Sequence, residues 1–199
     1  LIYKATHVPV GDDQKQHLEL ARDIAGSFNE KYADGKEFFP LPEPVITGEA
    51  TRVMSLRDGT QKMSKSAQSD MTRINLTDEA DAIAQKIRKA KTDAHPVPAT
   101  DKEGEGRAEA MNLIGIYAAL SDQTRVEVMN EFGGQPFSNL KTSLSDLAVE
   151  KLSPITSRMN ELMADEGEID RILSAGAQKA NELARPTLAE TMNLMGFWS

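Results

Sequence analysis

Two lysines, Lys62 and Lys65, lie three residues apart in a short segment of small and polar residues that reads Lys62-Met63-Ser64-Lys65-Ser66. Ammonium groups stabilise negative charge that develops on a phosphoryl group, and preorganised cations act more on the transition state than on the ground state. The hydroxyl groups of Ser64 and Ser66 can donate hydrogen bonds to phosphate oxygens. The segment predicts a mobile cationic clamp for phosphoryl transfer, and the alternative is an ordinary basic surface loop.

A second polar segment, Gly11-Asp12-Asp13-Gln14, follows an expected strand and opens an expected helix. In open α/β folds this position lies at the sheet edge where ligands bind, and backbone N–H groups point towards the ligand. Gly11 would let a ligand approach the backbone closely. A carboxylate there suits the hydroxyl donors of a ribose better than a phosphate, which it would repel. The segment is a candidate nucleotide site, and a simple capped turn is the alternative.

Strands and one helix are expected to position these segments. Tyr3–Val10 is predicted to be a short strand, and the apolar spacing that follows predicts an amphipathic helix over Gln14–Lys31. Its apolar face would be formed by Leu18, Ala21, Ala25, Phe28 and Tyr32. Val45-Ile46 and the run Arg52–Leu56 are further strand candidates, and the second of them leads through a Gly-containing turn to Lys62.

The rest of the chain has the pattern of helices only. Thr77 or Asp78 is predicted to cap the first of these helices, and Thr92–Gly106 is predicted to be a solvated loop. Pro154 is expected to kink a long helix or to mark a junction between two helices. Pro186 is expected to separate the last two helices of the chain.

A change of architecture near residue 66 is the expected domain boundary. Residues 1–66 are predicted to form an α/β unit, and residues 67–199 are predicted to form a helical bundle. The predicted fold class is therefore α/β plus all-α, with helix predominating. The chain also opens with Leu1-Ile2-Tyr3, an apolar, strand-like start without Met, from which we expect a fragment of a longer protein.

Composition excludes several classes of protein. The chain has 199 residues and no Cys, which excludes a disulfide scaffold, a thiolate zinc site and a thiol nucleophile. No apolar run approaches the roughly 20 residues that span a bilayer, and we expect a soluble, cytoplasmic protein. The net charge of −8 disfavours non-specific binding of nucleic acid, yet Lys62–Lys91 holds seven basic and four acidic residues. Its Lys86–Lys91 cluster is either a solvated helix face or part of a nucleic-acid contact.

Both polar segments resemble motifs of one enzyme class. Lys62-Met63-Ser64-Lys65-Ser66 matches, without departure, the signature of class I aminoacyl-tRNA synthetases. Gly11-Asp12-Asp13-Gln14 resembles the companion segment of the subclass that activates tryptophan and tyrosine. The run Val8–Glu19 is similar to bacterial tryptophanyl-tRNA synthetases in particular, and Gly176-Ala177-x-Lys179-Ala180 looks like their last long helix. The resemblance covers essentially the whole chain.

The resemblance implies a fold and a function for each of its two domains. Residues 1–66 would be the C-terminal half of a Rossmann-like catalytic domain, including the signature loop, and residues 67–199 would be a helical domain that binds the anticodon part of tRNA. The implied reaction is activation of L-tryptophan by ATP, which carries Mg²⁺, followed by transfer of the tryptophanyl group to tRNA. The family also implies a homodimer.

Individual residues take roles through the same resemblance. The nucleotide would be held by Gly11, Asp12 and Asp13, with Asp13 on the ribose, and by Val53, whose backbone would touch adenine. Tryptophan would be held by Gln14 at its polar end and by Val8 and Val10 beside the indole. Lys62 and Lys65 would be catalytic on the α-phosphate and the departing pyrophosphate, and Met63, Ser64 and Ser66 would complete the loop. No protein-bound metal is expected.

One departure from the family pattern is plain. The class also uses a His-x-Gly-His-type element, and this chain has none, since His7, His17 and His95 are widely separated. We therefore expect this chain alone to be inactive and the longer protein to be an enzyme. Two alternatives stay open: a tyrosyl-tRNA synthetase, and a non-catalytic tRNA-binding module in which the loop is a relic.

Overall fold

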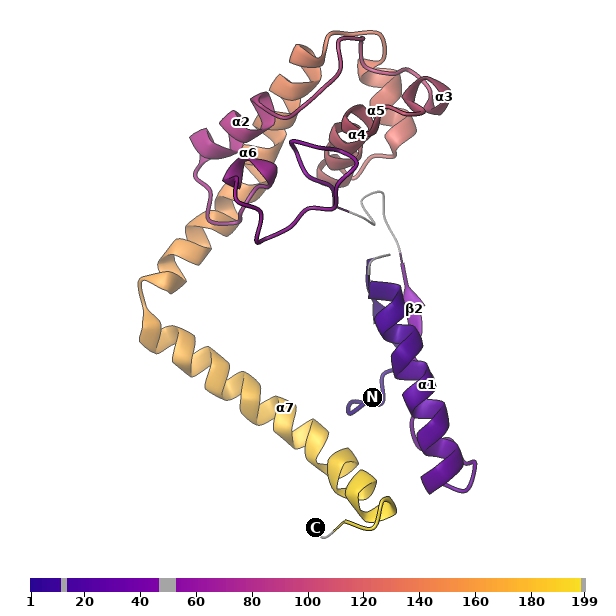
Figure 1. The fold of residues 1–199 in the computed structure, drawn as a ribbon. Helices are drawn as coiled ribbons and strands as arrows, with labels where there is room; N and C mark the ends of the chain where they lie inside the picture. Colours follow the sequence, from indigo (N-terminus) through magenta and orange to yellow (C-terminus); the bar gives the residue numbers. More distant parts are fainter. Residues whose placement is uncertain (12–13, 47–52, 198–199) are drawn as a thin grey trace. The chain divides into compact units, whose positions relative to one another are not determined.

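The computed structural model describes residues 1–11, 14–46 and 53–197. The chain forms two compact units, one built from residues 1–47 and 165–199 and the other from residues 48–164 (Figure 1). The boundary predicted near residue 66 falls inside the second unit. The physical reason is that Leu56, before that boundary, packs in the same core as Ile83 and Leu113, after it.

In the first unit, a short parallel pair of strands flanks one long helix. Strand β1 (His7–Pro9) pairs in parallel with β2 (Glu43–Val45), and helix α1 (Lys15–Tyr32) connects them. The predicted helix over Gln14–Lys31 is confirmed to within one residue. The strand predicted over Tyr3–Val10 is present but much shorter. The parallel pairing requires a crossover connection, which α1 provides.

Helix α1 is held to β2 by its buried face and by two polar side chains. Phe28 packs against Phe39, with ring centroids 4.9 Å apart. The side chain of Asn29 donates to the Phe39 carbonyl oxygen at 2.8 Å and accepts from the Phe39 amide at 2.9 Å. Arg22 reaches the carboxylate of Glu43 at 2.6 Å. These contacts fix the start of β2, and through the strand pairing they fix β1 and Gly11 behind it.

Two prolines lie inside continuous helices. Helix α7 (Glu166–Leu194) runs through Pro186, so the prediction that this residue separates two helices is wrong. Helix α6 (Phe137–Met163) likewise runs through Pro154, which excludes a junction there. A proline removes one backbone hydrogen bond and strains one turn, and favourable neighbours on both sides can carry the helix past it.

The second unit is a bundle of helices around an apolar core, with α2 lying along α6 (Figure 1). Its elements are η2 (Asp70–Thr72), α2 (Ala80–Arg88), α3 (Asp101–Gly104), α4 (Ala108–Ser121), α5 (Arg125–Phe132) and α6. The fully buried side chains of this core include Ile83, Ile87, Leu113, Ile114, Leu140 and Leu144. Helix predominates in the described chain, as predicted.

Three local predictions in this unit need correction. Of the strand predicted over Arg52–Leu56, Arg52 lies outside the described residues, and Met54 forms only a single antiparallel bridge to Lys62. Helix α2 begins at Ala80, two residues after Asp78, because the Asp78 carboxylate accepts from other groups instead of capping the helix. The loop predicted over Thr92–Gly106 contains the short helix α3. Among the described residues, no helix is long and apolar enough to cross a membrane.

Candidate active site

The signature segment begins on a tight hairpin. The amide of Ser55 donates to the carbonyl oxygen of Gln61 at 2.9 Å, and the amide of Met63 donates to that of Val53 at 3.1 Å. Met54 and Lys62 form the bridge between them. This pairing fixes the backbone of Lys62 against Met54, whereas the side chain of Lys62 is exposed.

The underside of the hairpin rests on helix α4. Gly59 is buried in the turn, and a Cβ atom at this position would lie 2.6 Å from the carbonyl carbon of Ala108. The side-chain amide of Asn112 donates to the Ser55 carbonyl oxygen at 3.3 Å. The amide of Lys91 donates to the carbonyl oxygen of Leu56, at 2.8 Å. The hairpin is thus seated on the bundle over most of its length.

The loop itself is exposed and makes a small turn of its own. The hydroxyl groups of Ser64 and Ser66 lie 3.0 Å apart, and the Ser66 amide donates to the Ser64 hydroxyl at 3.3 Å. The Ala67 amide donates to the Ser64 carbonyl oxygen at 3.3 Å. Ser64, Lys65 and Ser66 are exposed, whereas Met63 is half-buried and lines an apolar cavity of about 360 Å³. The polar groups therefore face solvent while Met63 faces the bundle.

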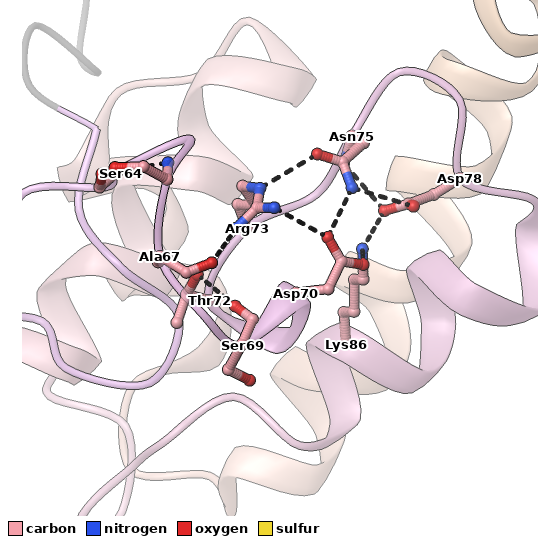
Figure 2. Close-up of polar contacts among 10 residues, drawn as sticks. Ser64, Ala67, Ser69, Asp70, Thr72, Arg73, Asn75, Asp78 and Lys86 are labelled. Carbon is pink, nitrogen blue, oxygen red and sulfur yellow. Dashed lines mark hydrogen bonds and ion pairs between the residues drawn. The ribbon is translucent and has the colours of Figure 1, made fainter.

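The chain beyond the loop is anchored by a polar network (Figure 2). One guanidinium nitrogen of Arg73 donates to the Ala67 carbonyl oxygen at 3.3 Å, and the other lies 3.2 Å from the carboxylate of Asp70. The side-chain amide of Asn75 donates to Asp70 at 2.9 Å and to Asp78 at 3.3 Å. These contacts connect the end of the signature loop to the residues before α2.

Lys86 closes this network from helix α2 (Figure 2). Its ammonium nitrogen lies 2.5 Å from a carboxylate oxygen of Asp70 and 2.5 Å from one of Asp78, and its side chain is 4% exposed. Burial alone would lower the pKa of Lys86, but the hydrogen bonds to Asp70 and Asp78 outweigh it, and its pKa is raised. The pKa of Asp70 is lowered, chiefly by its hydrogen bond to Lys86. Both groups are therefore held in their charged forms.

The Lys86 position corrects one sequence interpretation. The interpretation of Lys86–Lys91 as a solvated face is wrong for Lys86, which is buried. Lys89 and Lys91 are exposed, as that interpretation predicts. The signal was present in the sequence, because Lys86 follows Ile83 by three residues and adjoins Ile87 on the apolar face of the helix.

We expect Lys86→Met to lower the free energy of unfolding by about 2 kcal/mol. Breaking a fully buried ion pair costs about 3–5 kcal/mol, and the loss here is smaller because Asp70 is half exposed and Asp78 keeps its bonds to Asn75. Urea unfolding followed by circular dichroism measures it. The control is Lys89→Met, an exposed lysine on the same helix end, for which we expect a change within about 0.5 kcal/mol. Equal stability of the two variants would contradict the ion-pair argument.

The second candidate segment, Gly11-Asp12-Asp13-Gln14, belongs to the first unit. Val10 continues the strand pairing, since its amide donates to the Val45 carbonyl oxygen at 3.1 Å, and the Gln14 amide donates to the Gly11 carbonyl oxygen at 3.0 Å. Val8, Val10 and Gly11 are half-buried, whereas Gln14 is exposed. Asp12 and Asp13 lie outside the described residues. The structure thus confirms that a strand precedes this segment and that a helix follows it, and the role of the segment in nucleotide binding stays a prediction.

Solved structures share this fold. A crystal structure of tryptophanyl-tRNA synthetase from Mycoplasma pneumoniae matches 100% of this chain and 60% of its own, with a TM-score of 0.82 at 31% identity. A tryptophanyl-tRNA synthetase from Campylobacter jejuni, complexed with ADP and tryptophan, matches 99% of this chain and 59% of its own, with a TM-score of 0.66 at 27% identity. The fold is therefore that of a class I synthetase.

The sequence comparisons agree with the structures. The family model of tRNA synthetases class I (W and Y) matches residues 1–147, and the chain belongs to this family. A tryptophan--tRNA ligase from Caulobacter vibrioides is 57% identical over 198 residues, which are 100% of this chain and 57% of the relative. One from Brucella melitensis is 53% identical over 214 residues, which cover 99% of this chain and 60% of the relative.

The chain thus spans 57 to 60% of the length of these two relatives. The narrower prediction, that residues 1–66 are the C-terminal half of the catalytic fold, is not supported by these matches. They establish the class I fold over more than half of each relative.

Proposed function

We propose that the full-length protein is a tryptophan--tRNA ligase. It would join L-tryptophan to the α-phosphate of ATP, release pyrophosphate, and transfer the tryptophanyl group from the adenylate to tRNA. The observation that carries this proposal is the signature loop, whose two lysines are exposed above a hairpin that the bundle holds in place. The 57% identity to a tryptophan--tRNA ligase over the whole chain supports the choice of amino acid.

In this proposal, Lys62 and Lys65 stabilise the charge that develops as pyrophosphate departs. Ser64 and Ser66 have exposed hydroxyl groups that can donate to phosphate oxygens. Val53, whose residue surface is 53% exposed, offers its backbone to adenine at the start of the hairpin. Such catalysis depends on positioning and charge, and it needs no strong base from the protein.

The segment after β1 would hold the remaining parts of the two small substrates. Gly11, Asp12 and Asp13 would hold the nucleotide, with the carboxylate of Asp13 on the ribose. Gln14 would take the polar end of tryptophan, with Val8 and Val10 beside the indole. The parallel strand pair and α1 support this assignment, because ligands bind at such strand–turn–helix edges in α/β folds.

The other partners follow from the same proposal. ATP would bring Mg²⁺ with it, and the helices within residues 67–199 would contact tRNA. The full-length protein would be a homodimer in the cytoplasm. A non-catalytic tRNA-binding module would share these helices and would have no need of the exposed lysines of the loop.

Exchange of pyrophosphate into ATP by the purified full-length protein tests the proposal. We expect exchange to depend on tryptophan and to be faster with tryptophan than with tyrosine at equal concentration. A pocket built for the indole N–H leaves buried polar groups unpaired when it holds the wrong side chain. Faster exchange with tyrosine would overturn the specificity, and no exchange with either amino acid would leave the tRNA-binding module as the better account.

A further inference from the structure

Arg73 connects the signature loop to the residues before α2, because each nitrogen of its guanidinium group contacts a different residue (Figure 2). One nitrogen donates to the Ala67 carbonyl oxygen, directly after the signature residues, and another lies against Asp70. The third, Nε, donates to the side-chain oxygen of Asn75 at 3.3 Å. The side chain of Arg73 is 18% exposed, so the guanidinium group is largely shielded from solvent. The guanidinium group presents its donors in a fixed planar fork, whereas an ammonium group is a point charge on a flexible stem whose donors rotate.

The partners of Arg73 are themselves fixed. Asp70 accepts from the buried ammonium group of Lys86, at 2.5 Å, and from the side-chain amide of Asn75. Thr72 accepts the Leu56 amide at 2.9 Å through its carbonyl oxygen, so the hairpin and the η2 turn share a backbone hydrogen bond. The loop therefore leaves the hairpin at one end and meets the Arg73 network at the other, and both ends are fixed to one unit.

We propose that Arg73 is a positioning residue for the signature loop, holding the Ala67 carbonyl group so that Lys65 stays in register with the phosphates. This inference rests on the proposed function and adds a residue outside the signature motif. Arg73 itself touches no substrate in this account. Its effect passes through the exposed loop, where the hydrogen bonds between Ser64, Ser66 and Ala67 are local.

The first test is Arg73→Lys in the full-length protein. The ammonium group keeps the charge but lacks the planar fork that fits Ala67, Asp70 and Asn75 in their present positions. We expect kcat for pyrophosphate exchange to fall about tenfold, since small misplacements of reacting groups cost rate. We expect KM for tryptophan and the thermal unfolding midpoint to stay near their original values. Arg158→Lys is the matched control, because Arg158 is exposed on α6 and its ion pair with Glu161, three residues along the same helix, is local.

A second variant, Asp70→Asn, tests the same contact in case Arg73→Lys disturbs the fold. Asp70→Asn keeps the size of a half-exposed side chain and weakens its pairs with Arg73 and Lys86. We expect the same direction of change in kcat, and faster amide hydrogen exchange at Ala67 in both variants. Unchanged amide exchange and unchanged kcat in both would overturn the inference.

The decisive measurement is a double-mutant comparison. If Arg73 acts through Lys65, the tenfold effect of Arg73→Lys should largely vanish in a Lys65→Ala background. A full additional tenfold loss in that background would show that Arg73 acts elsewhere, and the inference would fail. If the unsubstituted full-length protein shows no tryptophan-dependent exchange, the proposed function is wrong. If the unsubstituted protein is active and Arg73→Lys does not change its activity, only the proposed role of Arg73 is wrong.

Discussion

Replacing both Lys62 and Lys65 by Ala in the full-length protein should lower tryptophan-dependent pyrophosphate exchange by about four powers of ten. Removing one preorganised donor to a developing oxyanion costs about a hundred- to a thousandfold, and two lysines act on the same departing group. Both side chains are exposed at the end of a seated hairpin, so their loss should leave the fold intact. Exchange measured at saturating ATP and tryptophan gives the comparison.

The control for this variant removes two other exposed lysines, Lys36 and Lys102, together. The net charge changes by the same amount, so a general electrostatic effect on ATP or tRNA would appear in both proteins. We expect the control to keep its exchange rate and both variants to keep their affinity for tRNA. Normal exchange by the protein without Lys62 and Lys65 would remove the basis for an enzymatic role of the loop.

The parts of the site that the sequence revealed are those encoded by local pattern. Five consecutive residues define the signature loop, and apolar spacing defines α1 to within one residue. Gly11 follows strand β1 and Gln14 precedes helix α1, as predicted, because each position depends only on its immediate neighbours. Local sequence patterns of this kind predict structure before any tertiary contact is known.

The parts that the sequence did not reveal depend on tertiary packing. Asp78 is a good helix cap by residue type, yet its carboxylate is drawn to the ammonium group of Lys86, eight residues away. Lys86 is a basic residue of the kind usually found at the surface, yet its side chain is buried with its ammonium group against Asp70 and Asp78. Arg73 meets Ala67 and Asp70 through a turn whose shape no periodic pattern encodes. The support of the loop is therefore a tertiary property, although its chemistry is a local one.

This support is concentrated where the hairpin meets helix α4. Gly59 is buried there, and its amide and the ammonium group of Lys91 both reach the carboxylate of Glu109, which lies 2.7 Å from Lys91. The pKa of Glu109 is lowered, chiefly by its hydrogen bond with Lys91. The hairpin, the segment after α2 and the first turn of α4 therefore meet at one charged carboxylate. A change in the space available to Gly59 should affect all three.

Gly59→Ala should lower the free energy of unfolding by about 3 kcal/mol, because overfilling a well-packed contact costs about 1–3 kcal/mol and the obstructing atoms here are backbone. The new Cβ would lie 2.6 Å from the carbonyl carbon of Ala108 and 2.6 Å from the Glu109 nitrogen, so the hairpin or the helix must move.

Urea unfolding followed by circular dichroism measures the effect of Gly59→Ala, and Gly176→Ala provides the matched control. Gly176 lies within α7 with nothing within 4 Å of its added Cβ, and alanine there should raise stability by about 0.5–1 kcal/mol. Opposite signs for the two variants are expected because the substitution is the same and only the space differs. If Gly59→Ala were as stable as the original protein, the hairpin could not be seated on α4 as the structure has it. The rigid support from which Lys62 acts would then have to come from elsewhere.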